Sequence, residues 1–130
     1  PWSAGLSASR AWAKVSASGP ATPLDGLRPS QTPAWTGNAQ LGWRQDGAAV
    51  TALLRYVGAQ YEDDLNRLRL PGAVTLDALA ALPLGRRWQI VARAENLFDR
   101  EVASAVTSDG VIERATPRTF WLGLRFNAAR

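Results

Sequence analysis

The chain has 130 residues, a formal net charge of +4, and neither Cys nor His. Without these two residue types it can form no disulfide, no thiolate nucleophile and no His-dependent triad, and it lacks the usual zinc ligands. No apolar run approaches the roughly 18 residues that a membrane-spanning helix needs, which excludes a helical membrane protein but not a β-barrel. We therefore expect neither an enzyme nor a bound cofactor or metal.

The cationic residues are almost all arginine, and they are spread along the chain instead of being clustered. Nucleic-acid-binding domains concentrate such charges in a basic patch or stripe, so we expect no nucleic-acid partner. The chain contains no Met and begins in the middle of a strand-like pattern, so we expect a segment of a longer polypeptide.

Hydrophobic residues recur with a period of two, which predicts β-strands. A first strand over residues 5–16 is small and polar, and its facing is ambiguous. The next two strands flank Gln45–Gly47, where Asp-Gly favours a tight hairpin. On one face these two strands carry Trp35, Ala39, Leu41, Trp43, Val50, Ala52, Leu54 and Tyr56.

A second hairpin is predicted around the short turn Leu84–Arg86, between strands over residues 74–82 and 88–95. The last strand, Arg118–Phe126, places four apolar side chains on one face, namely Phe120, Leu122, Leu124 and Phe126. The pattern therefore predicts an all-β fold with six antiparallel strands.

The connections between these strands alternate in length. Two are tight turns, and three are long and polar, over residues 19–32, 61–71 and 100–117. Outer-membrane barrels have short periplasmic turns and long extracellular loops. We therefore predict a segment of an antiparallel up-and-down transmembrane β-barrel, whose last strand runs from the outside towards the periplasm. Six strands are too few to close a barrel, so the first and last strands would be open edges.

Aromatic side chains of the apolar face gather at the strand ends. Such rings prefer the membrane interface, so we predict two aromatic girdles around an apolar band. The ring beside the short turns would contain Trp43, Trp88 and Phe126, and the ring towards the long loops Trp35, Tyr56, Phe98 and Phe120. The alternative is the core of a small soluble β-sandwich that binds a ligand and has no membrane role.

The opposite face carries charged side chains that a barrel would place in its hydrated lumen. These are Arg44, Arg55, Asp77, Arg93, Glu95 and Arg125. Leu53, Leu79 and Val91 share this face, so something packed inside the barrel would cover them. For Arg93 and Glu95 we expect a packing or structural role and no ligand contact.

Two short motifs mark the end of the fifth strand and the start of the sixth. Asn96 and Asp99 can bond their own backbone where a strand ends, and Phe98 can anchor at the interface. Pro117 stands just before a strand, where it removes no hydrogen bond from the ladder.

Together, Glu95–Glu101 (Glu-Asn-Leu-Phe-Asp-Arg-Glu) and Thr116–Phe126 (beginning Thr-Pro-Arg-Thr-Phe) resemble the C-terminal end of TonB-dependent outer-membrane receptors. Arg55–Tyr61 and Leu70–Asp77 are similar to the preceding strands of that family. The resemblance extends over essentially the whole chain and is strongest in its last third.

The resemblance implies a 22-stranded barrel around an N-terminal plug. Residues 1–130 would form the C-terminal portion of this barrel domain, without the plug. It also implies the outer membrane of a Gram-negative bacterium, contact with outer-membrane lipid, and uptake of a scarce nutrient driven by the TonB complex through the missing plug. The expected cargo is a ferric siderophore, with cobalamin or glycans as alternatives.

The resemblance also assigns one role to particular residues. A role in barrel assembly and closure is implied for Asn96, Phe98, Asp99, Arg118, Phe120 and Phe126. The tail Asn127–Arg130 follows the last aromatic residue and has no assigned role.

The loop over residues 61–69 would be extracellular and is the candidate for cargo contact, through Tyr61, Asp63, Asp64, Arg67 and Arg69. Its two arginines would attract an anionic ferric chelate, and its adjacent aspartates allow a calcium site. A solvated loop without a ligand is the plainer interpretation of both pairs.

Overall fold

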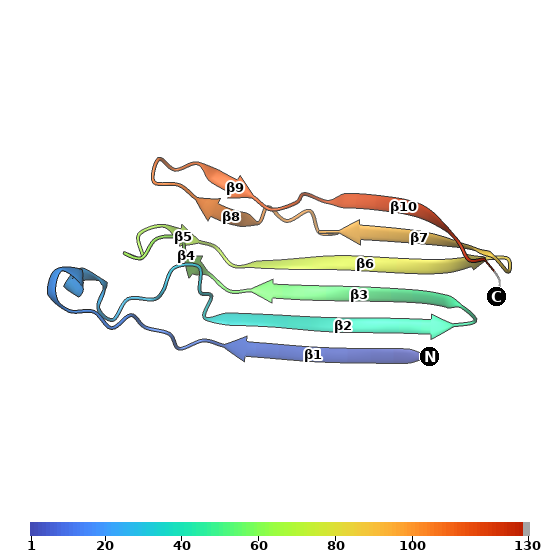
Figure 1. Cartoon of the computed structure of the whole chain (residues 1–130), viewed down its shortest axis with the longest axis horizontal. Helices are drawn as coiled ribbons and strands as arrows, with labels where there is room; N and C mark the ends of the chain where they lie inside the picture. Colours follow the sequence, from blue (N-terminus) through green and yellow to red (C-terminus); the bar gives the residue numbers. More distant parts are fainter. Residues whose placement is uncertain (129–130) are drawn as a thin grey trace.

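Six long strands form one antiparallel sheet in the computed structural model, which describes residues 1–128 (Figure 1). Their order in the sheet is β1-β2-β3-β6-β7-β10. The bounds are β1 Trp2–Arg10, β2 Trp35–Gln45, β3 Ala48–Val57, β6 Ala73–Leu84, β7 Trp88–Glu95 and β10 Thr119–Phe126. Each long strand pairs with the next one along the chain, which confirms the predicted up-and-down arrangement. The end of the Asn127–Arg130 tail lies outside the described residues.

Both short turns lie at the end of the sheet that also holds the N-terminus and the end of β10 (Figure 1). Asp46 and Gly47 alone join β2 to β3, with φ angles of 49° and 81°. Positive φ at both central residues gives a type I′ turn, whose twist matches that of an antiparallel hairpin. Residues 85–87 join β6 to β7, and Gly85 supplies the left-handed position with φ of 70°.

The three long connections lie together at the opposite end of the sheet (Figure 1). We call them loop 1 (residues 11–34), loop 2 (58–72) and loop 3 (96–118). Loop 1 contains a short 3₁₀ helix, η1 (Gly19–Leu24). Loop 2 contains the small ribbon of β4 (Gln60–Tyr61) and β5 (Arg69–Leu70), and loop 3 that of β8 (Ala103–Val106) and β9 (Ile112–Arg114). The predicted segregation of short and long connections is confirmed, whereas the small ribbons were not predicted because two to four residues are too few to show a period.

The predicted bounds of the first strand, residues 5–16, are wrong. β1 begins at Trp2 and ends at Arg10, where it pairs with Trp35 of β2. Beyond that pair the ladder continues through one bond, from the N–H of Ala11 to the carbonyl of Ala34 at 3.0 Å. Alternation of Ser, Ala and Gly gives little contrast in hydrophobicity, so the bounds follow from pairing with β2 and not from the strand's own sequence.

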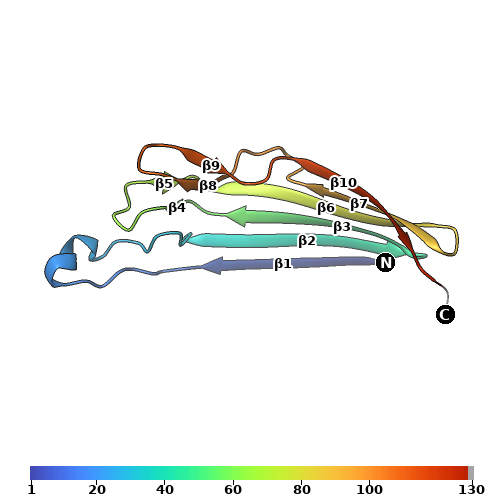
Figure 2. The ribbon, with the colours of Figure 1, turned by 45° about the horizontal axis from the view of Figure 1, so that its top comes forward.

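The sheet is a single curved layer (Figure 2). Within residues 1–128 no other element packs over either of its faces. Among the described residues, Leu70 is the only apolar residue of the buried core. Leu6 is 85% exposed and Leu122 is 81% exposed. The alternative of a soluble sandwich is therefore wrong, because a sandwich needs a second sheet to bury these side chains.

The register aligns the apolar side chains across the whole sheet. One row across the strands contains Trp2, Trp43, Val50, Ala80, Ala92 and Leu122. The neighbouring row, which points to the other face, contains Ser3, Gly42, Thr51, Leu79, Arg93 and Trp121. The predicted division into an apolar and a more polar face is thus confirmed.

Candidate functional site

The apolar face carries aromatic rings near both of its ends. At the short-turn end, the rings of Trp88 and Phe126 lie 4.8 Å apart between centroids, and Trp2 pairs with Trp43. Towards the long loops this face carries Trp35, Tyr56 and Phe120, and Phe98 follows β7 in the first turn of loop 3. Sequence reasoning missed Trp2, because the facing of the first strand became clear only from its pairing. The girdle role of these rings stays a prediction.

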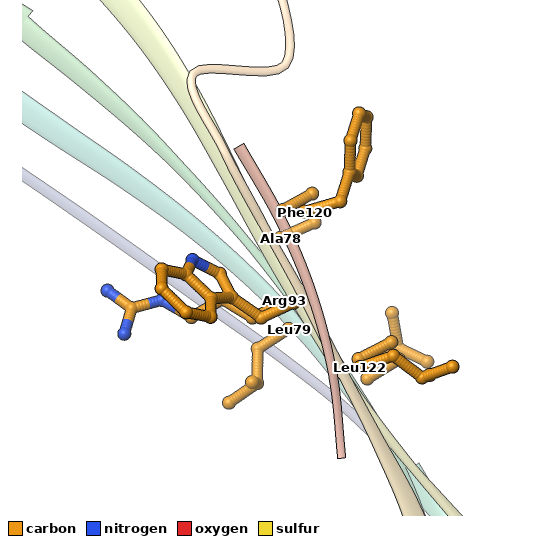
Figure 3. Close-up of a pocket in the computed structure, with 10 residues that line it drawn as sticks. Ala78, Leu79, Arg93, Phe120 and Leu122 are labelled. Carbon is orange, nitrogen blue, oxygen red and sulfur yellow. The ribbon is translucent and has the colours of Figure 1, made fainter. Parts of the chain in front are cut away.

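Between the aromatic ends, the face near the β10 edge is hollow. Small side chains leave a depression of about 330 Å³ here. Its lining contains four alanines and three larger apolar residues, namely Ala78, Ala80, Ala92, Ala94, Val50, Phe120 and Leu122. Residues of the other face also line it at the edge of the sheet. Figure 3 shows Phe120 and Leu122 on one side of the sheet and Arg93 on the other, as the register requires. The depression is lined mainly by apolar side chains, and among the described residues Arg93 at the edge is its one charged lining residue.

On the opposite face, charged side chains near the long-loop end surround a hollow of about 310 Å³. Arg55 and Asp77 lie 3.9 Å apart, and Arg93 forms an ion pair with Glu95 on the same strand. The two arginines are balanced by the two carboxylates, so these four side chains leave no net charge to attract a ligand. This arrangement agrees with the packing role expected for Arg93 and Glu95, which stays a prediction.

The acidic residues of loop 2 make hydrogen bonds within the protein. One carboxylate oxygen of Asp63 accepts the backbone N–H groups of Arg67 at 2.8 Å and Leu68 at 2.6 Å. Asp64 accepts the hydroxyl of Ser30, in loop 1, at 2.8 Å. Among residues 1–128, no group of three or more His, Cys, Asp or Glu side chains is placed to hold a metal ion.

Asn66 joins loop 2 to loop 1. Its side-chain oxygen accepts the N–H of Arg28 at 2.9 Å, and its amide nitrogen donates to the carbonyl of Arg28 at 2.8 Å. Asn66 has a φ of 55°, a left-handed conformation that Asn tolerates better than most residues. The N–H of Gln31 also donates to the carbonyl of Tyr61 at 2.6 Å. Loops 1 and 2 therefore form one structural unit.

This unit contains a cationic hollow of about 390 Å³, whose polar lining includes Lys14, Arg28, Tyr61, Asn66 and Arg69. None of the ion pairs found in the described chain involves its three cations. Of the five predicted cargo residues the structure brings Tyr61 and Arg69 into the hollow. Lys14 and Arg28 were missed, because no local signal shows that loop 1 folds against loop 2.

The remaining predicted cargo residues, Asp63, Asp64 and Arg67, do not line the cationic hollow. The two aspartates instead accept hydrogen bonds that hold the loops in place. The hollow is thus positively charged, and an anionic group would be complementary to it.

Asn96, at the start of loop 3, is buried and lies at the centre of a hydrogen-bond network. Its N–H donates to the carboxylate of Asp77 at 2.9 Å, and its side-chain oxygen accepts the N–H of Arg100 at 3.0 Å. Its amide nitrogen donates to the carbonyls of Arg100 at 2.9 Å and Thr116 at 3.3 Å. One side chain therefore joins the beginning of loop 3 to its end.

Asp99 makes a second connection across the same loop. Its carboxylate accepts the backbone N–H of Arg118 at 3.3 Å and lies 3.5 Å from the guanidinium of that residue. The two motifs that carry the family resemblance are thus in direct contact. The residues of these motifs keep their assembly role as a prediction.

The outer part of loop 3 is the β8–β9 ribbon, which is closed by Thr107 and Gly110. A hydrogen bond from the side chain of Thr107, and one from the backbone of Asp109 itself, hold the pKa of the Asp109 carboxyl below its usual value. Glu101 and Arg114 form an exposed ion pair at 2.7 Å at the base of the ribbon.

No helix among the described residues is long and apolar enough to cross a membrane.

Comparison with known proteins places this sheet in a family. The family model described as "TonB dependent receptor-like, beta-barrel" matches residues 1–97. The match ends just after Asn96, so it leaves out most of the last third, where the resemblance was expected to be strongest. No curated protein matches the chain.

Several solved receptors contain a similar sheet. The siderophore receptor PiuA from Acinetobacter baumannii is 19% identical with a TM-score of 0.71, over 79% of this chain and 15% of its own. The ferric yersiniabactin uptake receptor FyuA from Yersinia pestis is 23% identical with a TM-score of 0.71, over 79% of this chain and 17% of its own. The copper transporter OprC is 19% identical with a TM-score of 0.71, over 98% of this chain and 21% of its own.

At these identities the structural likeness shows the fold, and the chain spans about a fifth or less of each of the three receptors. The family comprises outer-membrane receptors and transporters of Gram-negative bacteria and is not an enzyme family. Since the family model matches well over half of the residues, the chain belongs to the TonB-dependent receptors and forms part of their β-barrel.

Proposed function

We propose that this chain is the C-terminal portion of the barrel wall in a receptor that imports a scarce nutrient across the outer membrane of a Gram-negative bacterium. The observation that carries the proposal is the single sheet with one apolar face, one polar face and all long loops at one end. Such a sheet separates lipid from an aqueous lumen, since every second side chain points to each side.

The exposed apolar side chains support the membrane setting. In water each large side chain would forgo roughly 1.5–3 kcal/mol of burial free energy. Lipid would cover the apolar face, and a plug from a part of the protein outside these residues would cover Leu53, Leu79 and Val91 on the other. We propose that the TonB complex acts on this plug and not on the barrel wall described above.

The loop end supports an anionic cargo. Tyr61 and Arg69 share the cationic hollow with Lys14 and Arg28, and no carboxylate lines that hollow. A ferric siderophore that carries carboxylate or deprotonated phenolate groups would be complementary to this charge. Two of the solved relatives are described as a siderophore receptor and a ferric yersiniabactin uptake receptor, which favours the same class of cargo.

Other cargo classes are alternatives within the same fold. One of the similar structures is a copper transporter, so the shape of the sheet does not select the cargo. Cobalamin and glycans lack the multiple negative charges that would favour the cationic hollow, and we rank them below an anionic chelate for that reason.

A deletion strain tests the proposal. Growth and uptake of radioactive iron would be measured with carboxylate, catecholate and hydroxamate ferric siderophores, and growth also with cobalamin or glycans as the limiting nutrient. We expect the deletion strain to grow and take up iron less well than its parent with at least one anionic ferric chelate, and the wild-type gene should restore both. When TonB is also deleted from the parent and from the deletion strain, the two strains should no longer differ. A defect confined to cobalamin or glycans would overturn the cargo, and recovery of the complete protein from cytosol or periplasm would overturn the membrane role.

A further inference from the structure

Along β1, the apolar face of the sheet ends at a positively charged residue. Trp2, Ala4, Leu6 and Ala8 pair with residues of the apolar face of β2. The next residue of the same parity is Arg10, which pairs with Trp35 at the boundary with the long loops. The surface that faces lipid thus changes from apolar to positively charged at this position.

Arg10 makes cation–π contacts with two aromatic rings. The central carbon of its guanidinium lies 4.7 Å from the ring centroid of Trp12 and 5.0 Å from that of Trp35. Both rings are exposed, at 75% and 46%. A cation–π contact engages the guanidinium without using its N–H donors as hydrogen-bond partners, so those donors stay available to an anion.

Two more cations lie beside Arg10. Lys14 and Arg28 line the same hollow of about 280 Å³, together with Trp12, Trp35 and small apolar residues. Backbone bonds of 2.8 Å and 2.9 Å between Val15 and residues 26–27 hold the two sides of loop 1 together at this place. No acidic residue lines the hollow, and within the described chain none of the three cations takes part in an ion pair.

We propose that these five residues, Arg10, Trp12, Lys14, Arg28 and Trp35, bind the phosphate group of an anionic lipid in the leaflet at the long-loop end. We call them the headgroup site. Three arguments support this occupant: the site continues the apolar face, its rings are of the type that lies at headgroup depth, and its charge is uniformly positive. A planar guanidinium with free donors suits two phosphate oxygens at once.

The proposal rests on the membrane setting of the family and on no particular cargo. Lys14 and Arg28 line both the headgroup site and the cationic hollow, so they cannot distinguish the two ligands. Arg10 lines only the headgroup site, and Arg69 lines only the cationic hollow. These two arginines therefore form a matched pair for the test.

The experiment uses the complete receptor in detergent. Native mass spectrometry would measure the binding of phosphatidylglycerol and of phosphatidylcholine with the same acyl chains, and inorganic phosphate would be added as a competitor. We expect phosphatidylglycerol to bind at least fivefold more tightly than phosphatidylcholine. Loss of one cation near an anionic headgroup corresponds to about a fivefold change, so Arg10→Gln should remove most of that preference.

Control variants separate the site from the general charge of the protein. Arg69→Gln, in the other hollow, and Arg86→Gln, at the short-turn end, remove the same charge and should leave lipid preference within twofold of wild type. Arg10→Lys keeps the charge without the planar fork and should retain part of the preference, which provides a second variant if Arg10→Gln does not fold.

Three results would overturn the proposal. They are equal affinity of the wild-type receptor for the two lipids, an equal loss of preference in Arg69→Gln or Arg86→Gln, and inorganic phosphate that competes at concentrations similar to those of the lipid. The last result would identify a solute site. Because uptake is measured separately with whole cells, a failure of the headgroup site would leave the proposed transport function standing, and a failure of the proposed cargo would leave the headgroup site standing.

Discussion

Loop 3 and the unit of loops 1 and 2 use their polar side chains in opposite ways. In loop 3, Asn96 and Asp99 connect the two ends of the same loop, and the nearby charges form the pairs Arg118–Asp99 and Arg114–Glu101. In the other unit, Asn66 connects two different loops, and the cations of the hollows have no ion-pair partner among residues 1–128. We infer that loop 3 mainly fixes how the last two strands meet, whereas loops 1 and 2 present charge to a ligand.

The largest effect is expected for Asn96→Ala. This change removes three side-chain hydrogen bonds at a position that is 5% exposed, and it forces Ala into a φ of 50°. We expect the complete receptor to lose about 3 kcal/mol of unfolding free energy, since buried groups are left without partners. Urea unfolding in detergent or vesicles, followed by tryptophan fluorescence, would measure it.

Asn38→Ala provides the matched control for this prediction. Asn38 lies on the more polar face of the sheet, in β2, and is exposed. Its side chain makes no hydrogen bond among those found in the described chain. We expect a change below about 0.5 kcal/mol. If the two alanine variants lost equal stability, loop 3 would not have the fixing role assigned to it.

The second effect tests whether loops 1 and 2 are one unit. In Asn66→Ala the amide of Arg28 loses its acceptor, which lies at 2.9 Å. We expect that amide to exchange its hydrogen about tenfold faster, the equivalent of roughly 1.4 kcal/mol of local stability. The amide of Leu97, which donates to Leu76 at 2.8 Å far from loop 1, is the internal control. Unchanged exchange at Arg28 would show that the two loops are independent.

The contrast between these regions also shows what local sequence signals can and cannot predict. The hairpin at Asp46–Gly47 and the two faces of β2, β3, β6, β7 and β10 were predicted correctly, because turn type and period-two alternation depend only on neighbouring residues. The facing of β1 was not predictable in this way, since Ser and Ala alternate with little contrast. Its pairing with Trp43 and Trp35 decides it.

The candidate site was predicted only in part for the same reason. Asn96 and Asp99 were recognised because they lie in a motif with local turn chemistry. Lys14 and Arg28 were not recognised, because their approach to Arg69 depends on how two loops fold against each other. The hydrogen bond between Asp64 and Ser30 was equally invisible. It shows that Asp64 helps to hold the two loops together, and the expected cargo contact of this residue stays a prediction.

The third prediction concerns the cargo and depends on the proposed function. Arg69→Gln should weaken binding of an anionic ferric chelate about fivefold, which corresponds to roughly 1 kcal/mol for one unpaired cation near the ligand. Arg67→Gln, in the same loop but outside the cationic hollow, should change the affinity less than twofold. Titration of the complete receptor with the chelate, followed by fluorescence quenching, would compare them. Equal effects of the two substitutions would remove the distinction between the hollow and the rest of the loop.

The smallest effect is expected where charges are already paired. Glu101→Gln removes the ion pair with Arg114 in loop 3, whose side chains are 72% and 60% exposed. Exposed pairs contribute little, so we expect less than about 0.5 kcal/mol of unfolding free energy and no change in chelate affinity. The same urea and titration measurements apply. If this variant lowered chelate affinity as much as Arg69→Gln, loop 3 would also contact cargo. The division of roles between the two loop regions would then not hold.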